Sequence, residues 1–216
     1  MTEFTGASQW YNVSFSIANG WLKQGGKVVN DLYAQSPEDV RLGLNRLGLN
    51  TEELEKDNRV RIWDYYTATL GQKSKEKLAR DTLKIADLSI IFARDGIIQH
   101  LDGPPDPDCL IIRDNVSTLA RFNEERVVVE FILTRLIPYH KSQKSPTLMG
   151  ILRGVHSGSA YEQLEAAADG IIDLKLDDVA DPPRNLIRMR SVRNVGFDGR
   201  WHPLKIRDNF EFTLEK

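Results

Sequence analysis

The chain has 216 residues, a formal net charge of −2 and a sequence pI near 6.1, and 41% of its residues are hydrophobic. This length favours one domain with a substantial core, and the charge excludes a general attraction to nucleic acid or to an anionic membrane surface. The single cysteine, Cys109, excludes an internal disulfide framework and is typical of a reducing cytosol. No apolar run approaches the roughly 18 residues of a membrane span, and the N-terminus lacks the features of a secretory signal. We therefore expect a cytoplasmic protein.

Helices and strands are expected to alternate along the first half of the chain. Ser36 followed by Pro37 is a strong helix start, because serine caps free N–H groups and proline at the first helical position loses no hydrogen bond. Asn50 and Glu53 have the spacing of a capping box. In chain order the pattern predicts a helix at 13–22, a strand at 27–33, a helix at 36–48, a short helix from 50, a strand at 60–66, a charged helical segment at 74–80, an extended segment at 82–88 and a helix over 89–101.

The second half of the chain continues this alternation. Three prolines beside glycine and acids in GPPDPD (103–108) predict an exposed loop. After the loop we expect a strand at 109–114, a long helix at 123–137, a strand at 146–152, a helix at 162–168, a strand at 169–176, and two closing strands at 185–191 and 202–208. Strands that alternate with helices predict an α/β fold with a largely parallel sheet covered on both faces, which the closing strands extend in antiparallel fashion.

Seven segments of the chain, in their order and spacing, resemble one family. They are GASQWYNVSFSI (6–17), SPEDVRLGLNRLGLNTEEL (36–54), ADLSIIFARDGI (86–97), LIIRDNVSTL (110–119), LEAAADGIIDL (164–174), RMRSVRN (188–194) and HPLKI (202–206). Together they resemble the KaiC-like branch of the RecA superfamily of P-loop ATPases, over nearly the whole chain. The resemblance implies a single domain at 1–216 with a three-layer α/β sandwich. The chain starts at or inside the expected first strand, so an upstream segment usual for the family is expected to be missing. Family members commonly form hexameric rings that hold nucleotide between subunits.

The phosphate-binding loop of that family is altered here. A P-loop, GxxxxGK[ST], holds phosphates with backbone N–H groups, a lysine and a hydroxyl that binds magnesium. When the shared FSI segment is aligned, Gly6 matches the first glycine, whereas Tyr11, Asn12 and Val13 replace the second glycine, the lysine and the hydroxyl residue. A register without gaps puts Trp10 at the lysine position. The first 22 residues contain no lysine or arginine, so either register predicts a degenerate loop.

The resemblance also locates the other ATPase groups. Paired glutamates of the family are replaced by Ala34 and Gln35, and glutamine can orient a water but cannot take its proton. Asp114 matches the metal-facing aspartate at the end of a strand, and remains a nucleotide-binding candidate together with Gly6. The residue before it, Arg113, is costly in a buried strand unless it is paired, so it is expected either to pair with Asp114 or to face solvent.

One cationic motif of the family is retained. The family carries K-x-R on a C-terminal strand, where the cations reach the γ-phosphate bound by a neighbouring subunit. Arg188 and Arg190 occupy these positions, and strand alternation places both on one face. They are candidates for binding phosphate in trans. A solvated strand face opposite Ile187 and Met189 explains the pattern equally well.

Other polar clusters match no established site pattern. The histidine and aspartates at 100, 102, 106 and 108 fit no EF-hand or zinc spacing, so no metal site is predicted. Lys141 and Lys144 are expected in a solvated loop, with too little charge for nucleic acid. His156 and Ser157 lack a third partner for a serine-hydrolase site, and Cys109 is expected to pack in a strand.

These observations predict a catalytically degenerate KaiC/RecA-like protein of archaeal or bacterial type that works as a non-hydrolysing structural or regulatory assembly subunit. Expected partners are copies of itself or an active KaiC/RecA-like paralogue, with no nucleic acid and no membrane. No cofactor is required, and ATP with magnesium binds only weakly if at all. The alternative is a weak or altered ATPase that uses Asp114 with Arg188 and Arg190 in trans. A third hypothesis, an inactive DNA-binding filament protein, is disfavoured by the net charge.

Overall fold

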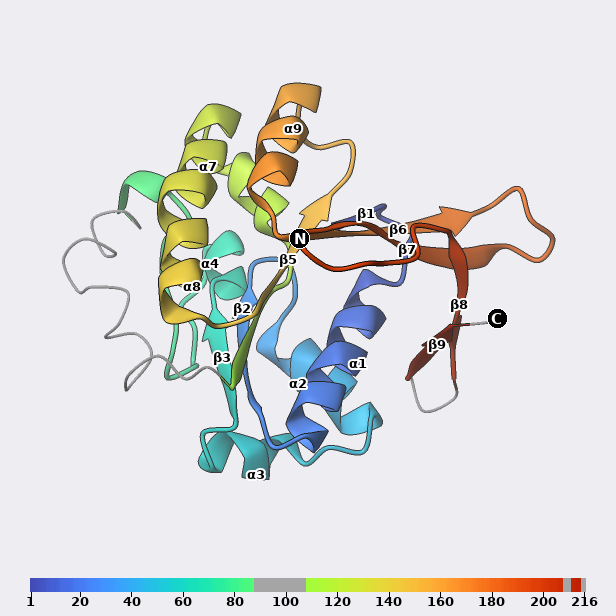
Figure 1. Ribbon diagram of the computed structural model, residues 1–216. Coiled ribbons are helices and arrows are strands. Elements are labelled where there is room, and N and C mark those ends of the chain that lie inside the picture. The colour runs from blue at the N-terminus through green and yellow to red at the C-terminus, as the bar shows by residue number, and fades with distance from the viewer. Residues whose placement is uncertain (88–107, 208–210, 215–216) are drawn as a thin grey trace.

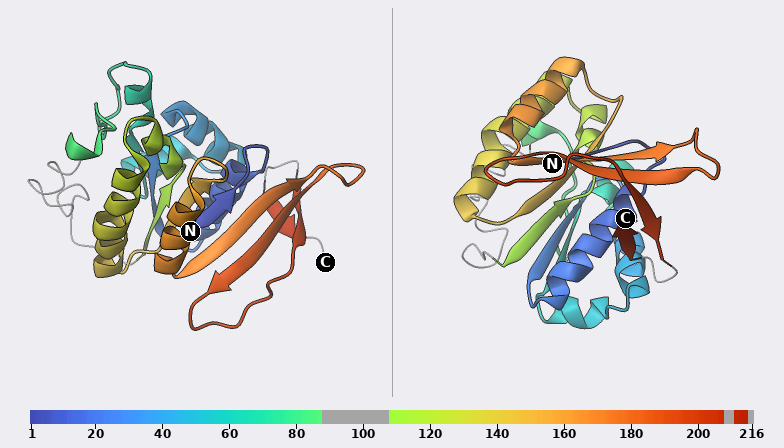
Figure 2. Two further views of the ribbon diagram at one scale, coloured as in Figure 1. Left: turned by 90° about the horizontal axis from the view of Figure 1, so that it is seen from above. Right: turned by 45° about the vertical axis from the view of Figure 1, so that its right-hand side comes forward.

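The described residues form a nine-stranded sheet between two layers of helices (Figures 1 and 2). The computed structural model describes residues 1–87, 108–207 and 211–214. Strand order is β3-β2-β4-β5-β1-β6-β7-β8-β9, parallel from β3 to β6 and antiparallel from β6 to β9. The strands are β1 (Thr2–Phe4), β2 (Lys27–Leu32), β3 (Val60–Asp64), β4 (Cys109–Arg113), β5 (Thr147–Leu152), β6 (Gly170–Asp177), β7 (Arg184–Val192), β8 (His202–Ile206) and β9 (Phe212–Leu214). The predicted α/β sandwich with antiparallel closing strands is confirmed.

The helices divide between the two faces of the sheet. They are α1 (Trp10–Lys23), α2 (Pro37–Arg46), α3 (Thr51–Lys56), α4 (Tyr66–Thr69), α7 (Glu125–Phe131), α8 (Ile137–Gln143) and α9 (Gly158–Ala167), with a 3₁₀ helix η1 (Val116–Arg121) and a π-helical segment η2 (Ile132–Leu136). Successive strand residues point to opposite faces, so Val28 packs with α1 and α2 while Val29 packs with α7. None of the described helices has the length and apolar composition that crossing a bilayer requires.

Several predicted elements differ from the structure. Residues 74–80 form no helix; Ala79 instead pairs with Asp64 in an isolated bridge, and the Ser74 hydroxyl donates to the Asp64 carboxylate at 2.5 Å. The predicted extended segment at 82–88 turns helical at 85–87. The predicted helix over 89–101 lies outside the described residues, as does 103–107 of the predicted loop. Strand β9 was not predicted at all.

The long helix opposite α1 runs past the proline at which it was predicted to end. Residues 125–143 are helical throughout, and the π-helical turn at 132–136 ends two residues before Pro138. Proline has no N–H to donate, and its ring clashes with the carbonyl four residues earlier in an ordinary α-helix. A wider turn relieves that clash, because π segments change the spacing between the ring and the preceding carbonyls. The helix therefore ends at Gln143, and Lys144 follows with a φ of 56°.

Helix α2 provides a direct test of how the sequence sets an element. Its N-cap, Ser36, accepts a hydrogen bond from the Asp39 N–H at 3.1 Å, and Pro37 is the first helical residue. We expect Ser36→Ala to lower the free energy of unfolding by about 1 kcal/mol, and Ser36→Asn to restore most of it. Urea denaturation of the three proteins measures both changes. Equal loss in the alanine and asparagine variants would show that the cap does not carry the effect.

Candidate functional site

The loop between β1 and α1 lies at the carboxyl end of a central strand, where ligands of parallel α/β sheets bind. It comprises only five residues, Thr5–Gln9. Gly6 does not have a positive φ, and a Cβ added to it would meet nothing within 4 Å. The N-cap residue Gln9 makes no side-chain capping hydrogen bond. The helix starts at Trp10, which coincides with the register that puts Trp10 at the lysine position of a P-loop.

Trp10 is completely buried beneath this loop. Its ring stacks on Phe4 with centroids 5.5 Å apart, and its indole Nε1–H donates to the backbone carbonyl of Asp114. Gly150 of β5 makes room for it, since a Cβ there would lie 2.3 Å from the Asp114 carbonyl oxygen and 2.8 Å from the indole. The indole therefore fills the space between the ends of β4 and β5.

The carboxylate of Asp114 is held by backbone N–H groups on both oxygens. Oδ1 accepts from Tyr33 at 2.7 Å and Asn115 at 2.6 Å, and Oδ2 accepts from Ala34 at 2.9 Å and Gln35 at 3.0 Å. Burial raises the pKa of Asp114 to about 6, and the four donors oppose this shift. A metal ion at this carboxylate would have to displace donors that already fix the β2–α2 loop.

The Asp114 carboxylate and its four N–H donors are called the Asp114 clamp below. The other residues that differ from the family's motif lie near this clamp, and their side chains have different surroundings. Asn12 and Gln35 line one cavity of about 230 Å³ beside Tyr11. Val13 is fully buried in the core between α1 and the sheet. Ala34 takes part through its backbone N–H. The structure thus brings Asn12 and Gln35 together, whereas Val13 faces away into the core.

Arg113 pairs with neither Asp114 nor solvent, so both of its expected positions are wrong. Its guanidinium bonds Asp31 of the neighbouring strand at 2.5 Å and the Tyr33 hydroxyl at 2.8 Å, and lies 3.2–3.3 Å from His140 Nε2. Asp31 of β2 lies directly beside Arg113, because the two residues are register partners in the parallel pair of β2 and β4. Burial, followed by the Arg113 charge, lowers the pKa of His140 to about 2. This ion pair neutralises a charge that would otherwise be buried alone.

Arg188 and Arg190 lie on one face of β7, as alternation predicts, and are bound by carboxylates of their own chain. Arg188 Nε lies 2.7 Å from Asp173 Oδ2, and Arg190 Nε lies 3.1 Å from the same oxygen. Arg190 also bonds Glu165 at 2.8 Å and Glu3 at 2.5 Å. Both arginine side chains keep about a quarter of their surface exposed, at 30% and 25%.

The carboxylates of this cluster were missed by sequence reasoning. Glu3 is fully buried on the central strand; burial and a hydrogen bond with Glu165 raise its pKa, which Arg190 and Arg153 lower. Arg153 bonds Glu3 at 2.5 Å, so two arginines compensate it. The available signals were two acids within predicted or expected strand segments, Glu3 and Asp173, but their convergence depends on strand order.

Two further polar groups differ from expectation. His156 does have partners: its Nε2 lies 2.9 Å from the Ser117 hydroxyl and its Nδ1 lies 3.4 Å from Glu125. Ser117 is buried and its hydroxyl already accepts from the Leu152 N–H, which leaves no access for a substrate. Lys141 lies in α8 rather than in a loop.

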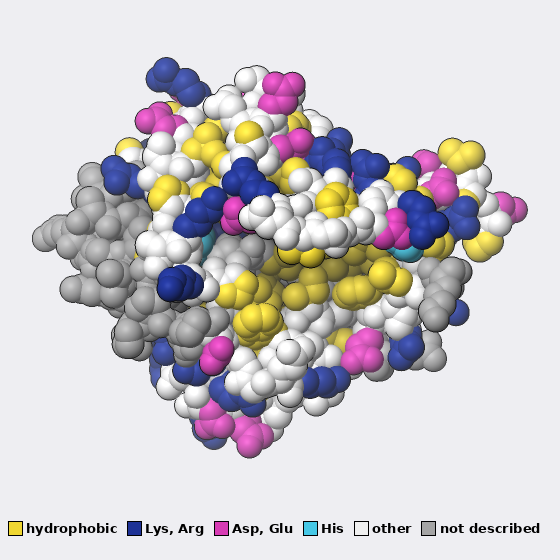
Figure 3. Space-filling view, viewed as in Figure 1, with side chains coloured by type: hydrophobic (Ala, Val, Ile, Leu, Met, Phe, Trp, Pro, Cys, Tyr) yellow, Lys and Arg dark blue, Asp and Glu magenta, His cyan; other side chains and the backbone are white. Residues whose placement is uncertain are grey.

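On the face that Figure 3 shows, basic and acidic side chains are interspersed around an apolar band, and the basic side chains form no continuous track. Cys109 is buried in β4, as predicted. Among the described residues no group of three or more histidines, cysteines or acids is placed to hold a metal ion.

Replacing Trp10 with lysine tests whether this site tolerates the charge that a P-loop needs. The change removes the bond to Asp114 and puts an ammonium into the indole space, so the free energy of unfolding should fall by about 4 kcal/mol or more. Gln9→Lys, one residue earlier and half-buried, should cost less than about 1 kcal/mol. Chemical denaturation compares them, and a Trp10→Lys protein as stable as the Gln9→Lys protein would contradict the packing described here.

Comparison with known proteins is consistent with this architecture. A family model described as KaiC ATPase matches residues 15–211, which begins after the β1–α1 loop. The KaiC-like protein PH0186 of the hyperthermophilic archaeon Pyrococcus horikoshii has a similar structure, with a TM-score of 0.69 and 15% identity over 100% of this chain and 88% of that one. PH0321 from the same organism, described in complex with an unknown peptide, gives a TM-score of 0.74 and 13% identity over 99% of this chain and 90% of that one. The comparison with curated proteins finds no match. Because the family model covers most of its length, the chain belongs to the KaiC ATPase family.

Proposed function

We propose that this KaiC-family protein does not hydrolyse ATP and instead works as a structural or regulatory subunit of a cytoplasmic assembly. The observation that carries the proposal is the buried Trp10 indole, which takes up the start of α1 and bonds the Asp114 backbone. Phosphate binding at a P-loop requires a lysine and free backbone N–H groups at that place. An indole supplies neither.

The magnesium side of the site supports the same proposal. A P-loop ATPase holds the metal with a hydroxyl on α1 and a carboxylate at the end of a strand. Here the hydroxyl position carries Val13 or, in the register without gaps, Tyr11, while both oxygens of Asp114 accept two backbone N–H groups each. Gln35 cannot act as a general base in place of the missing glutamate. No cofactor is required by this role.

The retained arginines support an assembly role. Arg188 and Arg190 are partly exposed on β7 and share the carboxylate of Asp173. A phosphate bound by a neighbouring subunit offers a stronger anion than a shared carboxylate, so it would compete for these guanidinium groups. In this form of the proposal the chain supplies cations to an active KaiC/RecA-like paralogue.

Nucleotide binding tests the first part of the proposal. Titration of the purified protein with Mg·ATP and with Mg·ADP should give no saturable heat, and no phosphate release should exceed that of the buffer. Micromolar binding or measurable turnover would contradict the proposal. Loss of that turnover in Asp114→Asn, with folding confirmed by circular dichroism, would favour the alternative of a weak ATPase.

Assembly tests the second part. Light scattering should give a mass above the 24.6 kDa of one chain, either alone or after co-expression with an active paralogue. In a mixed assembly, Arg188→Ala should lower the paralogue's ATP turnover by about 10³-fold without dissociating the complex. Asp173 keeps Arg190 as a partner in that variant. Arg193→Ala, in the residue that directly follows the same strand, is the matched control, and its side chain is half exposed. A monomer in both preparations would exclude the assembly role.

A further inference from the structure

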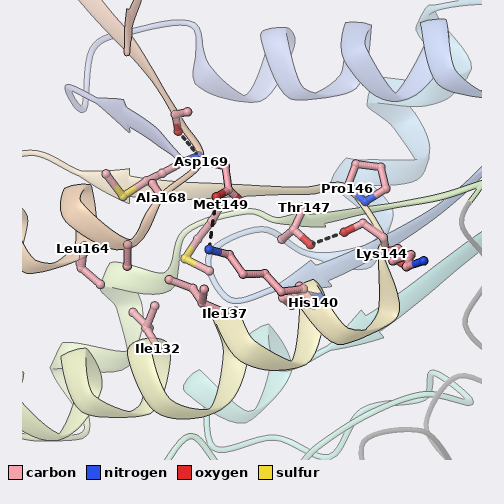
Figure 4. A pocket seen from close by; sticks show the side chains of 15 residues that line it. Ile132, Ile137, His140, Lys144, Pro146, Thr147, Met149, Leu164, Ala168 and Asp169 are labelled. Atoms are coloured by element: carbon pink, nitrogen blue, oxygen red, sulfur yellow. Dashed lines mark hydrogen bonds and ion pairs between the residues drawn. The ribbon is translucent and has the colours of Figure 1, made fainter. Parts of the chain in front are cut away.

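A second cavity opens at the amino edge of the sheet, opposite the β1–α1 loop. It has a volume of about 370 Å³ and lies where the amino ends of β1, β5 and β6 meet the last turns of α8 and α9 (Figure 4). Met1, Thr147 and Gly170 mark those strand ends in its lining. Neither Asp114 nor Arg188 lines it, so the cavity is separate from the site described above.

The walls of this cavity are formed largely by apolar side chains. Ile132, Ile137 and Leu164 come from the helical layer and Met149 comes from β5, and all four belong to or pack against the main core. The volume lies within the range of pockets that take up a ligand or the side chains of a partner. An apolar group that enters such a cavity leaves water, which is favourable without any specific polar contact.

The loop between β7 and β8 leaves the sheet at the rim of this cavity. Val192, the last residue of β7, is the register partner of Gly170, and the N–H of Arg193 donates to the Asp169 carbonyl at 2.9 Å. Asp169 and Gly170 both line the cavity. The left view of Figure 2 shows the loop projecting beyond this edge of the sheet. The cavity and the loop therefore lie on the same face of the molecule.

Two large apolar side chains of this loop are exposed. Val195 has 63% of its surface exposed and Phe197 has 45%. The turn that carries them is held by its own hydrogen bonds, because the Asp198 carboxylate accepts from the backbone N–H and the guanidinium of Arg200 at 2.8–3.0 Å. Since these bonds already order the turn, a partner that takes up Phe197 pays little further ordering cost.

An exposed aromatic side chain and an apolar cavity on one face allow two copies of the chain to pair. Phe197 does not line the cavity of its own chain. Around a two-fold axis each copy can insert Phe197 into the cavity of the other, so the same contact is made twice and the assembly closes. A buried aromatic anchor of this kind contributes a large share of the affinity of an interface.

The charges around the two features are complementary. At the cavity, Lys141 and Asp169 form an ion pair at 3.2 Å, and both side chains are exposed. On the loop, Arg200 and Asp198 form an ion pair at 2.8 Å. Each feature therefore has one cation and one anion beside it, so Arg200 of one copy can face Asp169 of the other while Asp198 faces Lys141. Lys144, which also lines the cavity, adds a second cation for Asp198.

From this arrangement we propose that two copies of the chain associate through the amino edges of their sheets, each inserting Val195 and Phe197 into the cavity of the other. The inference rests on the proposed function in that it names a partner for the assembly role. The contact uses neither the Asp114 clamp nor the retained arginines.

A change at the loop tests the inserted side chain. Analytical ultracentrifugation of the unchanged chain should give a dimer with twice the mass of 24.6 kDa. Phe197→Asp should raise the dissociation constant by about 30-fold or more, because it puts a charge into an apolar cavity. Val179→Asp is the matched control, since Val179 is 92% exposed on the turn between β6 and β7, and it should leave the dimer intact.

A change at the cavity tests the other half of the contact. Ala167→Leu adds volume to the lining and should weaken the dimer, whereas Ala166→Leu, at the exposed neighbouring position, should not. A mixture of Phe197→Asp and Ala167→Leu proteins should dimerise more tightly than either variant alone. The first variant still has an open cavity and the second still has Phe197, so one of the two insertions is restored. This gain also shows that both variants are folded.

The outcomes separate this inference from the assembly role in general. A monomeric unchanged chain, an assembly that Phe197→Asp leaves unaffected, or a mixture that dimerises no more tightly than its components would overturn the inference. If such a chain still enters a complex with an active paralogue, the assembly role stands without this contact. A dimer that depends on Phe197 and also hydrolyses ATP would support the contact and contradict the proposed lack of hydrolysis.

Discussion

The clamp around the Asp114 carboxylate organises the carboxyl edge of the sheet. One side chain at the end of β4 accepts three N–H groups from the turn after β2 and one from its own neighbour, so it fixes two strands and the approach to α2 together. The same residue's carbonyl receives the Trp10 indole, which ties in α1. In α/β proteins generally, ligands bind at the loops that follow the carboxyl ends of the parallel strands. Here the polar groups of these loops are bound to one another.

The arginines of β4 and β7 show two different ways in which a protein tolerates a buried or partly buried charge. Arg113 is enclosed, and a neighbouring strand supplies Asp31 at the same level of the sheet. Arg188 and Arg190 are partly exposed and share carboxylates with a third arginine on the neighbouring loop. When a fully enclosed ion pair is broken, the remaining charge is buried without a partner. The arginines of a partly exposed network can instead exchange a carboxylate for an anion from solution. The first arrangement is suited to stability and the second to exchange.

Local signals in the sequence were sufficient for most elements and insufficient for the contacts between distant segments. Ser36-Pro37 and Asn50 start helices where capping chemistry predicts, because caps depend on residues within four positions. The long helix was predicted to end at Ile137, but it continues to Gln143 through a π-helical segment that precedes Pro138. The charged segment at 74–80 lacks a helix because Ser74 and Ala79 are held by Asp64. Arg113 was assigned wrong partners because the choice depends on which strand lies beside β4.

The place of β1 in the sheet has a consequence for how the chain folds. Its three residues lie between β5 and β6 and pair with both, in register with Gly150–Leu152 and with Ile172–Leu174. Strand β1 therefore has its partners about 150 and 170 positions further along the chain. Contacts of such long sequence separation form late, because closing a long loop costs entropy before any pairing rewards it. During synthesis the four strands β3, β2, β4 and β5 can assemble as one unit, but the two halves of the sheet are joined only when β6 has emerged and both can close on Thr2–Phe4.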